Sequence, residues 1–180
     1  MSGVQIGSLV SANSIAAGLI NVPAGLLTDL YKKKAGLIIS SSAFMLFLGF
    51  LMVSFLSESN WVVLGFLSFI ILGSGANLWH PPAFAVLSSK YPEKKAYALG
   101  VHLSAASAGN ALGPLITGSL LSGIVIYKSL EINFNWKELA FLMAILCLIL
   151  SLIVFLFSVK ISIESSERLD FQRYFSKAVQ

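Results

Sequence analysis

The sequence predicts an all-α integral membrane protein with five transmembrane helices. Hydrophobic residues make up 57% of the chain and charged residues only 11%, which is too apolar for a water-soluble domain of this length. The stretches without any charged residue are 1–28, 35–57, 59–89, 96–127 and 139–159. Each can cross a hydrocarbon core of about 30 Å as a helix.

We therefore expect spans near residues 4–27, 35–56, 61–87, 96–127 and 139–159, followed by a charged tail at 160–180. Strands are not expected, because the apolar runs lack the period-two alternation of a membrane barrel. The second and fifth spans are almost free of polar residues, which suits helices that face lipid on the outside of a bundle.

The basic residues alternate between the two sides of the predicted membrane. The first connection, the third connection and the tail hold ten of them, whereas the second and fourth connections hold only Lys128 and Lys137. The positive-inside rule then places the tail in the cytoplasm and the N-terminus outside, in a plasma (inner) membrane. This placement makes the lipid bilayer the expected partner and argues against nucleic acid.

Chemistry-bearing residues are few within the spans. Two histidines, His80 and His102, are the only groups there whose unperturbed pKa lies near neutrality, and Cys147 is the only cysteine of the chain. No span contains a carboxylate, and no Ser-His-Asp or metal-ligand spacing is present. We therefore expect no enzymatic activity, no cofactor and no metal site.

Polar and small residues gather on one face of three predicted helices. In each case the spacing is three, four or seven residues, so the side chains share a face at about 100° per residue. Two interpretations stay open for these faces: a tight helix interface, or the lining of a substrate or proton pathway. The candidate pathway residues are Ser14, Asn21, Asn77, His80, His102, Asn110 and Thr117.

The Pro81-Pro82 pair directly follows His80 in the third span. Two consecutive prolines remove two backbone donors and bend a helix, which frees carbonyl groups for a neighbour, water or ligand. Broken helices of this kind commonly line cavities. His80 is therefore either a proton or substrate group, or a neutral histidine bonded to a backbone carbonyl.

The connection between the first two spans reads Gly-Leu-Leu-Thr-Asp-Leu-Tyr-Lys-Lys-Lys over residues 25–34. It resembles the loop between helices two and three of the major facilitator superfamily of secondary transporters, whose pattern is G-x-x-x-D-(R/K)-x-G-(R/K)-(R/K). Gly25, Asp29, Lys33 and Lys34 match this pattern, while Leu30 and Lys32 depart from it. The resemblance implies that the matching residues form a cytoplasmic latch that breaks and reforms as the transporter alternates.

A second resemblance lies in the fourth span. Residues 109–118 are similar to the motif G-x-x-x-G-P-x-x-G-G in helix five of the members that export drugs by antiport, with matches at Gly109, Gly113, Pro114 and Gly118 and a departure at Thr117. The segment 73–118 particularly resembles the fosmidomycin-resistance group. No arginine stands in residues 61–79, so proton coupling through an arginine of this span is not implied.

The resemblance implies that the five spans correspond to helices two to six of a superfamily N-terminal bundle, with residues 160–180 beginning the interdomain linker. Helix one and the second half would then be missing partners. The expected function of the full-length form is secondary active transport, namely proton-coupled efflux of a small amphipathic or anionic compound, with this chain as a fragment. The alternative is a membrane scaffold or accessory subunit that transports nothing.

Overall fold

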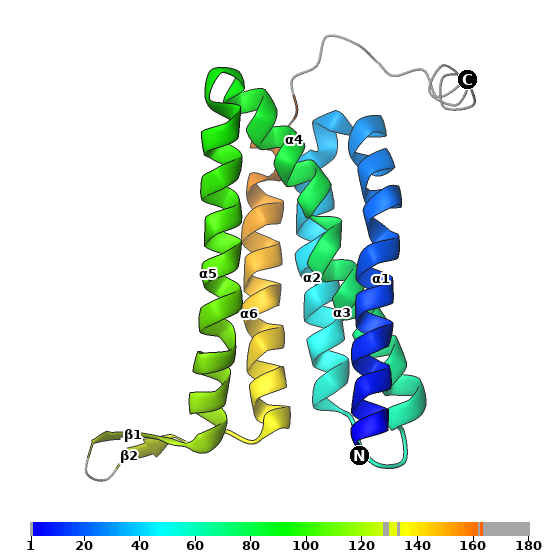
Figure 1. The fold of residues 1–180 in the computed structure, drawn as a ribbon, viewed down its shortest axis with the longest axis vertical. Helices are drawn as coiled ribbons and strands as arrows, with labels where there is room; N and C mark the ends of the chain where they lie inside the picture. The colour runs from blue at the N-terminus through cyan, green and yellow to red at the C-terminus, as the bar shows by residue number, and fades with distance from the viewer. Residues whose placement is uncertain (1, 128–129, 133, 162, 164–180) are drawn as a thin grey trace.

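Six α-helices make up most of the fold in the computed structural model, which describes residues 2–127, 130–132, 134–161 and 163. Helices α3 and α4 follow one another along a single span, and the successive spans run antiparallel, so that the connections between spans alternate between two ends of the molecule (Figure 1). The helices are α1 (Gly3–Leu30), α2 (Ala35–Ser54), α3 (Phe66–Leu78), α4 (His80–Lys90), α5 (Lys95–Ser122) and α6 (Trp136–Phe157). This confirms the predicted fold class.

Four segments are long and apolar enough to cross a membrane: Gly3–Leu30, Lys32–Ser54, Trp61–Lys90 and Trp136–Phe157. The third of these contains a π-helical turn at Trp61–Gly65 followed by α3 and α4. Helix α5 is 28 residues long but does not belong to this apolar set. Its many small and hydroxyl residues lower its hydropathy.

The predicted span 96–127 needs a correction at its end, because α5 stops at Ser122. Gly123 adopts a φ of 86°, a conformation that favours glycine and ends the helix. The residues that follow are mostly β-branched and form strand β1 (Ile124–Tyr127), which pairs antiparallel with β2 (Leu130–Ile132). The expectation of no strands therefore fails in this hairpin.

Helix α2 is the packing centre of the bundle, because it contacts both α3 and α6 extensively. Ser40 and Ser151 each donate to the other's carbonyl oxygen at 3.0 Å, which joins α2 to α6. Ser42 Oγ donates to the Gly75 carbonyl at 2.6 Å, which joins α2 to α3. The expectation that the second span lies on the outside of the bundle is therefore wrong for this face of α2.

Helix α1 packs on α3 at close range. Gly73 approaches the backbone of Asn13 so closely that a side-chain carbon there would overlap with it. The Asn13 amide spans the same contact and donates to the Phe69 carbonyl at 3.0 Å. A small residue and an interhelical hydrogen bond thus hold α1 in place, as is usual where lipid removes the hydrophobic drive for helix pairing.

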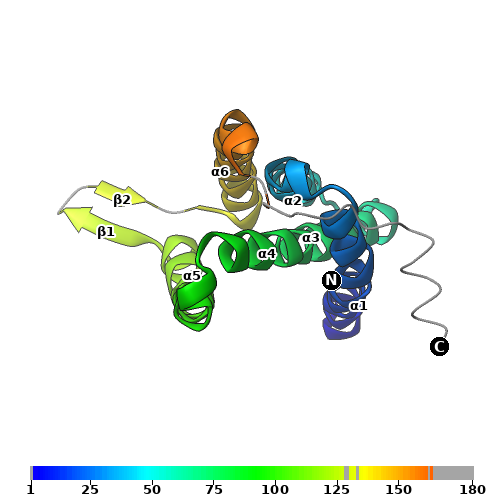
Figure 2. The same cartoon turned by 90° about the horizontal axis from the view of Figure 1, so that it is seen from above.

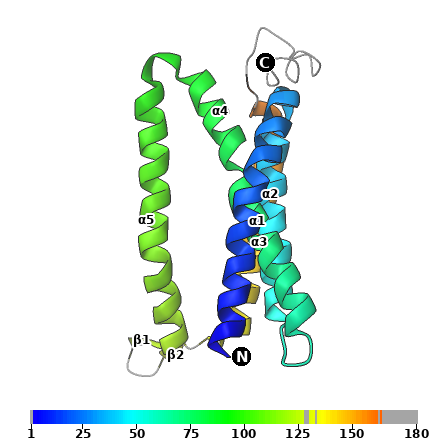
Figure 3. The same cartoon turned by 45° about the vertical axis from the view of Figure 1, so that its right-hand side comes forward.

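Helix α5 stands apart from α1, and α4 leads from it toward α3 when the fold is seen from above and from the side (Figures 2 and 3). Its contacts are mainly with α4 and α6, and they are far less extensive than those that α2 makes. No residue of α5 is buried. The fold therefore has a packed part, made of α1, α2, α3 and α6, and one sparsely packed helix.

One end of the bundle carries the basic connections. The 3-10 turns Lys32–Lys34 and Pro92–Lys94 lie there together with Ser158–Lys160 (Figure 1). Gly36 donates its backbone N–H to Ile161 at 3.1 Å and Ile163 donates to Lys32 at 3.0 Å, so the chain after α6 pairs with the first connection. The opposite end carries the N-terminus and the hairpin.

Gly73→Ala should destabilise the bundle by about 1–3 kcal/mol, because the new methyl group overlaps with the Asn13 backbone and forces α1 away from α3. Gly109→Ala is the matched control, since nothing lies within 4 Å of its added carbon. It should stay within about 0.5 kcal/mol of the parent. Denaturation by SDS in mixed micelles, followed by circular dichroism, measures both. An equal loss of unfolding free energy in Gly73→Ala and Gly109→Ala would contradict the close contact between α1 and α3.

Candidate functional site

The break between α3 and α4 follows from the proline pair. Trp79 separates the two helices, and Pro81 and Pro82 occupy the first turn of α4, where missing N–H groups cost least. Trp79 keeps helical dihedral angles, φ −81° and ψ −18°, so the chain bends without unwinding. Figure 3 shows the resulting change of direction between α3 and α4. Pro82 is fully buried at this bend.

Four aromatic rings meet at this break. His80 stacks on Trp79 with ring centroids 4.4 Å apart, and His102 of α5 lies 4.9 Å from the same indole. Phe84, one turn further along α4, lies 5.8 Å from His80 and 5.3 Å from His102. The two imidazoles are 6.4 Å apart and nearly perpendicular, at 88°. We call Trp79, His80, Phe84 and His102 the four-ring cluster.

The cluster encloses two polar atoms without partners. Nδ1 of His80 and Nε2 of His102 are buried and form no hydrogen bond within the described part of the chain. The indole N–H of Trp79 already donates to the Ala76 carbonyl at 2.9 Å. A buried polar atom without a partner carries a free-energy cost, so such atoms commonly mark functional positions.

The sequence prediction placed His80 and His102 among the pathway residues, and the structure brings these two together. It does not bring the others to them. Asn77 is half-buried and donates to the Gly73 carbonyl of its own helix at 3.3 Å. Ser14 and Asn21 are exposed and donate to Val10 and Ala17 in their own helix. Asn110 and Thr117 lie on the exposed surface of α5.

The antiporter-like motif of α5 forms an open face. Gly109, Pro114 and Gly118 are exposed, Gly113 is half-buried, and a side-chain carbon added at any of the three glycines would meet nothing within 4 Å. The small-residue face thus has no close helix partner within the described residues. Such a face fits close approach by another helix, which is the physical sense of the motif.

The latch residues lie at the basic end of the bundle. Gly25 and Asp29 are half-buried on α1, four residues apart and so on the same face. Lys33 and Lys34 are exposed in the 3-10 turn, and the Lys34 ammonium lies 6.0 Å above the centre of the Tyr31 ring. The carboxylate and the two ammonium groups therefore share one end of the molecule, where another segment can reach them.

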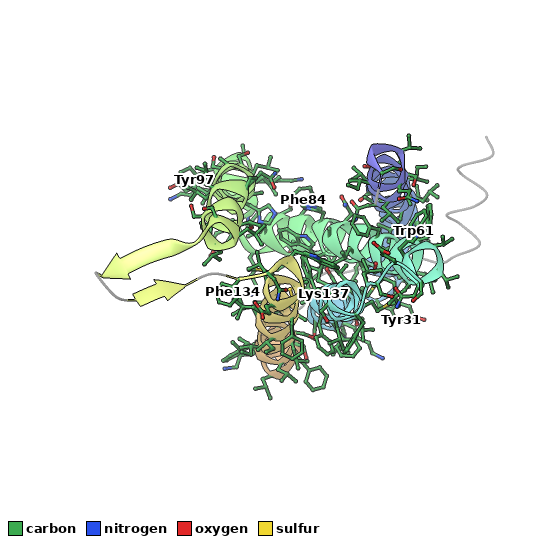
Figure 4. All side chains as sticks on the ribbon, turned by 90° about the horizontal axis from the view of Figure 1, so that it is seen from below. Tyr31, Trp61, Phe84, Tyr97, Phe134 and Lys137 are labelled. Atoms are coloured by element: carbon green, nitrogen blue, oxygen red, sulfur yellow. The ribbon has the colours of Figure 1, made fainter. Side chains whose placement is uncertain are left out.

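Two apolar grooves open on the bundle surface. One, of about 460 Å³, lies between α1 and α3 beside Ile15, Leu19 and Ile70. The other, of about 480 Å³, lies between α2 and α6 beside Phe55, Phe141 and Lys137. Phe134 and Lys137, which also line it, lie beside the start of α6 (Figure 4). Ser14 and Asn21, predicted to line a pathway, are not among the lining residues of the first groove.

Three important residues escaped the sequence reasoning. Asn13 bonds α1 to α3 although it lies off the predicted polar face, and Trp79 and Phe84 complete the ring cluster. Only the position of Trp79 beside the His-Pro-Pro sequence could have indicated it. Phe84 is one of 13 phenylalanines and gave no separate signal.

Comparison with known proteins decides the family. The family model described as Major Facilitator Superfamily matches residues 1–175. The chain belongs to this superfamily. Searches of curated proteins and of solved structures found no match.

Membership and the apolar helices together make the chain an integral membrane protein of a secondary-transporter superfamily, whose members are transporters and not enzymes. The predicted family and the coarse functional class are therefore confirmed. Among the described residues, no group of three or more His, Cys, Asp or Glu side chains could hold a metal ion.

Proposed function

We propose that this chain is the greater part of one half of a proton-coupled secondary transporter that exports a small amphipathic or anionic compound. The match to the superfamily over residues 1–175 carries the proposal. Superfamily transporters bind substrate between two six-helix halves. The spans of this chain are fewer than one half contains, so we propose that it works as a fragment, together with the missing helices.

The exposed face of α5 supports this assembly. In the superfamily the second half packs against the first, and helix five with its small-residue motif belongs to the moving interface. Gly109 and Gly118 lie open on α5 with no neighbour within 4 Å. The resemblance of residues 73–118 to the fosmidomycin-resistance group favours a phosphonate or another small anion as the substrate class.

A non-transporting scaffold is the second candidate. The same open face of α5 and the apolar α1–α3 groove, of about 460 Å³, would then bind partner helices permanently. The two functions differ in their requirement for a complete pathway, which only a transporter needs.

Transport of labelled fosmidomycin tests the proposal. The chain alone and the longest genomic reading frame that contains it are reconstituted in proteoliposomes with an imposed pH gradient. The longer protein should accumulate the label with the gradient, and the chain alone should stay within about twofold of empty vesicles.

A proton ionophore should abolish the accumulation if coupling is to protons. If the reading frame adds no spans and the chain alone moves neither fosmidomycin nor a panel of small anionic antibiotics, the transporter assignment fails and the scaffold remains.

We further propose that the basic end of the bundle faces the cytoplasm. The first and third connections and the chain after α6 share this end, and lysines concentrate there. In a Cys147→Ser background, Glu58→Cys should react with an impermeant maleimide in intact cells and Lys94→Cys should react only after permeabilisation. The reverse labelling pattern would overturn this orientation.

Asp29 is proposed as a latch residue and not a substrate ligand, because it lies in the last turn of α1 beside the basic connection. In the longer protein, Asp29→Asn should lower kcat by about tenfold, since the balance between conformations shifts, while KM stays within about threefold. Asp29→Glu is the matched control and should keep most of the rate. If Asp29→Asn raises KM by a larger factor than it lowers kcat, Asp29 is a substrate ligand and not a latch residue.

A further inference from the structure

We propose that His80 and His102 form one proton-binding site shared between α4 and α5, which takes up a single proton per chain. The inference rests on the proton-coupled function proposed above and specifies where and in what number the protons bind. Its starting observation is geometric: the two imidazoles lie 6.4 Å apart at 88°, and each contributes one buried nitrogen without a partner.

The walls of the site are neutral aromatic rings. Trp79 and Phe84 each contact both imidazoles, with centroid distances between 4.4 and 5.8 Å. The Trp79 N–H is committed to the Ala76 carbonyl and does not serve the histidine nitrogens. Trp79 and Phe84 therefore provide no carboxylate that could stabilise two positive charges. They also provide no hydrogen-bond donor for Nδ1 of His80 or Nε2 of His102.

The charged residues nearest along the chain lie at the ends of the two helices. Lys90 ends α4 and Lys95 begins α5, with Glu93 and Lys94 in the turn between them. Helix α1, which also packs on α4, carries Asp29 in its last turn. Helix α2, which also packs on α4, carries no charged residue, and α6, which packs on α5, carries Lys137 and Glu138 in its first turn and Cys147 further along. Among the described residues, the titratable ring in contact with each histidine is the other histidine.

A metal ion fits the site less well than a proton. Zinc usually takes four protein ligands in a structural site and three in a catalytic site. Among the described residues, no three His, Cys, Asp or Glu side chains are placed so that they could hold a metal ion together. Two imidazoles can instead bind one proton as an imidazolium and a neutral acceptor.

A second proton is disfavoured by charge repulsion. Two imidazolium rings 6.4 Å apart would interact through aromatic surroundings of low dielectric constant. The proposed site therefore holds one proton for the two rings together. The proton enters from water and leaves to water, with no bond to carbon formed or broken.

The shared proton would also act on the fold. Helix α5 has no buried residue and only sparse contacts with the rest of the bundle, and the four-ring cluster is one of its links to α4. Protonation makes both nitrogens of one ring N–H donors, while the other ring stays neutral and keeps one nitrogen lone pair as an acceptor. The proton then strengthens the link between α4 and α5, and its loss releases that link.

The chain holds only two histidines, so nitrogen NMR with labelled histidine reports on this site alone. The full chain, labelled with ¹⁵N-histidine and washed with EDTA, is measured in lipid bilayers between about pH 8 and pH 5. One imidazolium per chain should appear, and the signals of both rings should change with the same midpoint. Two imidazolium equivalents, two independent midpoints, or no protonation would each overturn the proposal.

Variants separate coupling from simple exposure. His102→Gln should shift the His80 midpoint by at least about one pH unit, because the partner that shares the proton is lost. Ser119→Ala, an exposed change about five turns along α5 from His102, should leave the curve unchanged. Circular dichroism confirms that both variants are folded. If the His80 titration curve is the same in His102→Gln as in the parent, the shared proton site is refuted. It is also refuted if the pH-dependent change of the histidine signals is seen only in samples that were not washed with EDTA.

The outcome is independent of the transport result. If one shared proton is found but transport by the longer protein ignores the pH gradient, proton coupling fails and the site stands. If transport follows the gradient but the pair binds two protons or none, the shared site fails and proton coupling stands.

Discussion

The hydrogen bonds of the buried serines of α2 determine how the rest of the bundle is arranged. In lipid, apolar surfaces gain little by leaving the solvent, so helices associate through close packing and a few polar contacts. Ser40 with Ser151 fixes α2 against α6, and Ser42 with the Gly75 carbonyl fixes it against α3. Helix α3 in turn holds α1 through Asn13. The packed part of the molecule thus extends outward from α2, and its interhelical polar contacts fall at small residues, where backbones can approach.

Helix α5 packs against the rest of the bundle in a different way. Its glycines have no neighbour within 4 Å among the described residues for an added side-chain carbon to meet, and no residue of the helix is buried as a whole, although Nε2 of His102 is. Its aromatic contacts with α4 come from rings placed by a helix break, not from interhelical serine hydrogen bonds. Contacts of this type can rearrange with a change of rotamer or charge, whereas the serine contacts need two helices to separate. The structure therefore joins a fixed group of helices to one that is more easily moved.

The sequence predicted the helical membrane fold, the order of the spans and the alternation of basic connections, because charge-free length and lysine placement depend only on local residues. It also predicted a bend at Pro81-Pro82, because two consecutive prolines remove two backbone donors. It failed at Ser122, where a single glycine conformation ends the helix. It could not show that Ser40 meets Ser151 or that Asn13 crosses to Phe69, because these pairs are distant in sequence and their residue types are common in spans. The predicted charged tail at 160–180 lies outside the described residues from 164 onward.

The position of the proline pair explains why the two histidines, and not the other polar residues, form the candidate site. Pro82 cannot donate to the carbonyl four residues earlier, at Leu78, so the backbone at this level is less well satisfied than in an unbroken helix. Asn77, Ser14 and Asn21 each donate a hydrogen bond to a carbonyl of their own helix, so none of these side chains is left without a partner. Nδ1 of His80 and Nε2 of His102 have no hydrogen-bond partner among the described residues, because their ring neighbours are aromatic side chains. A polar side chain inside a membrane can bind a proton or a ligand when its neighbours do not already form hydrogen bonds with it. Among the described residues, the two histidines meet this condition where α3, α4 and α5 come together.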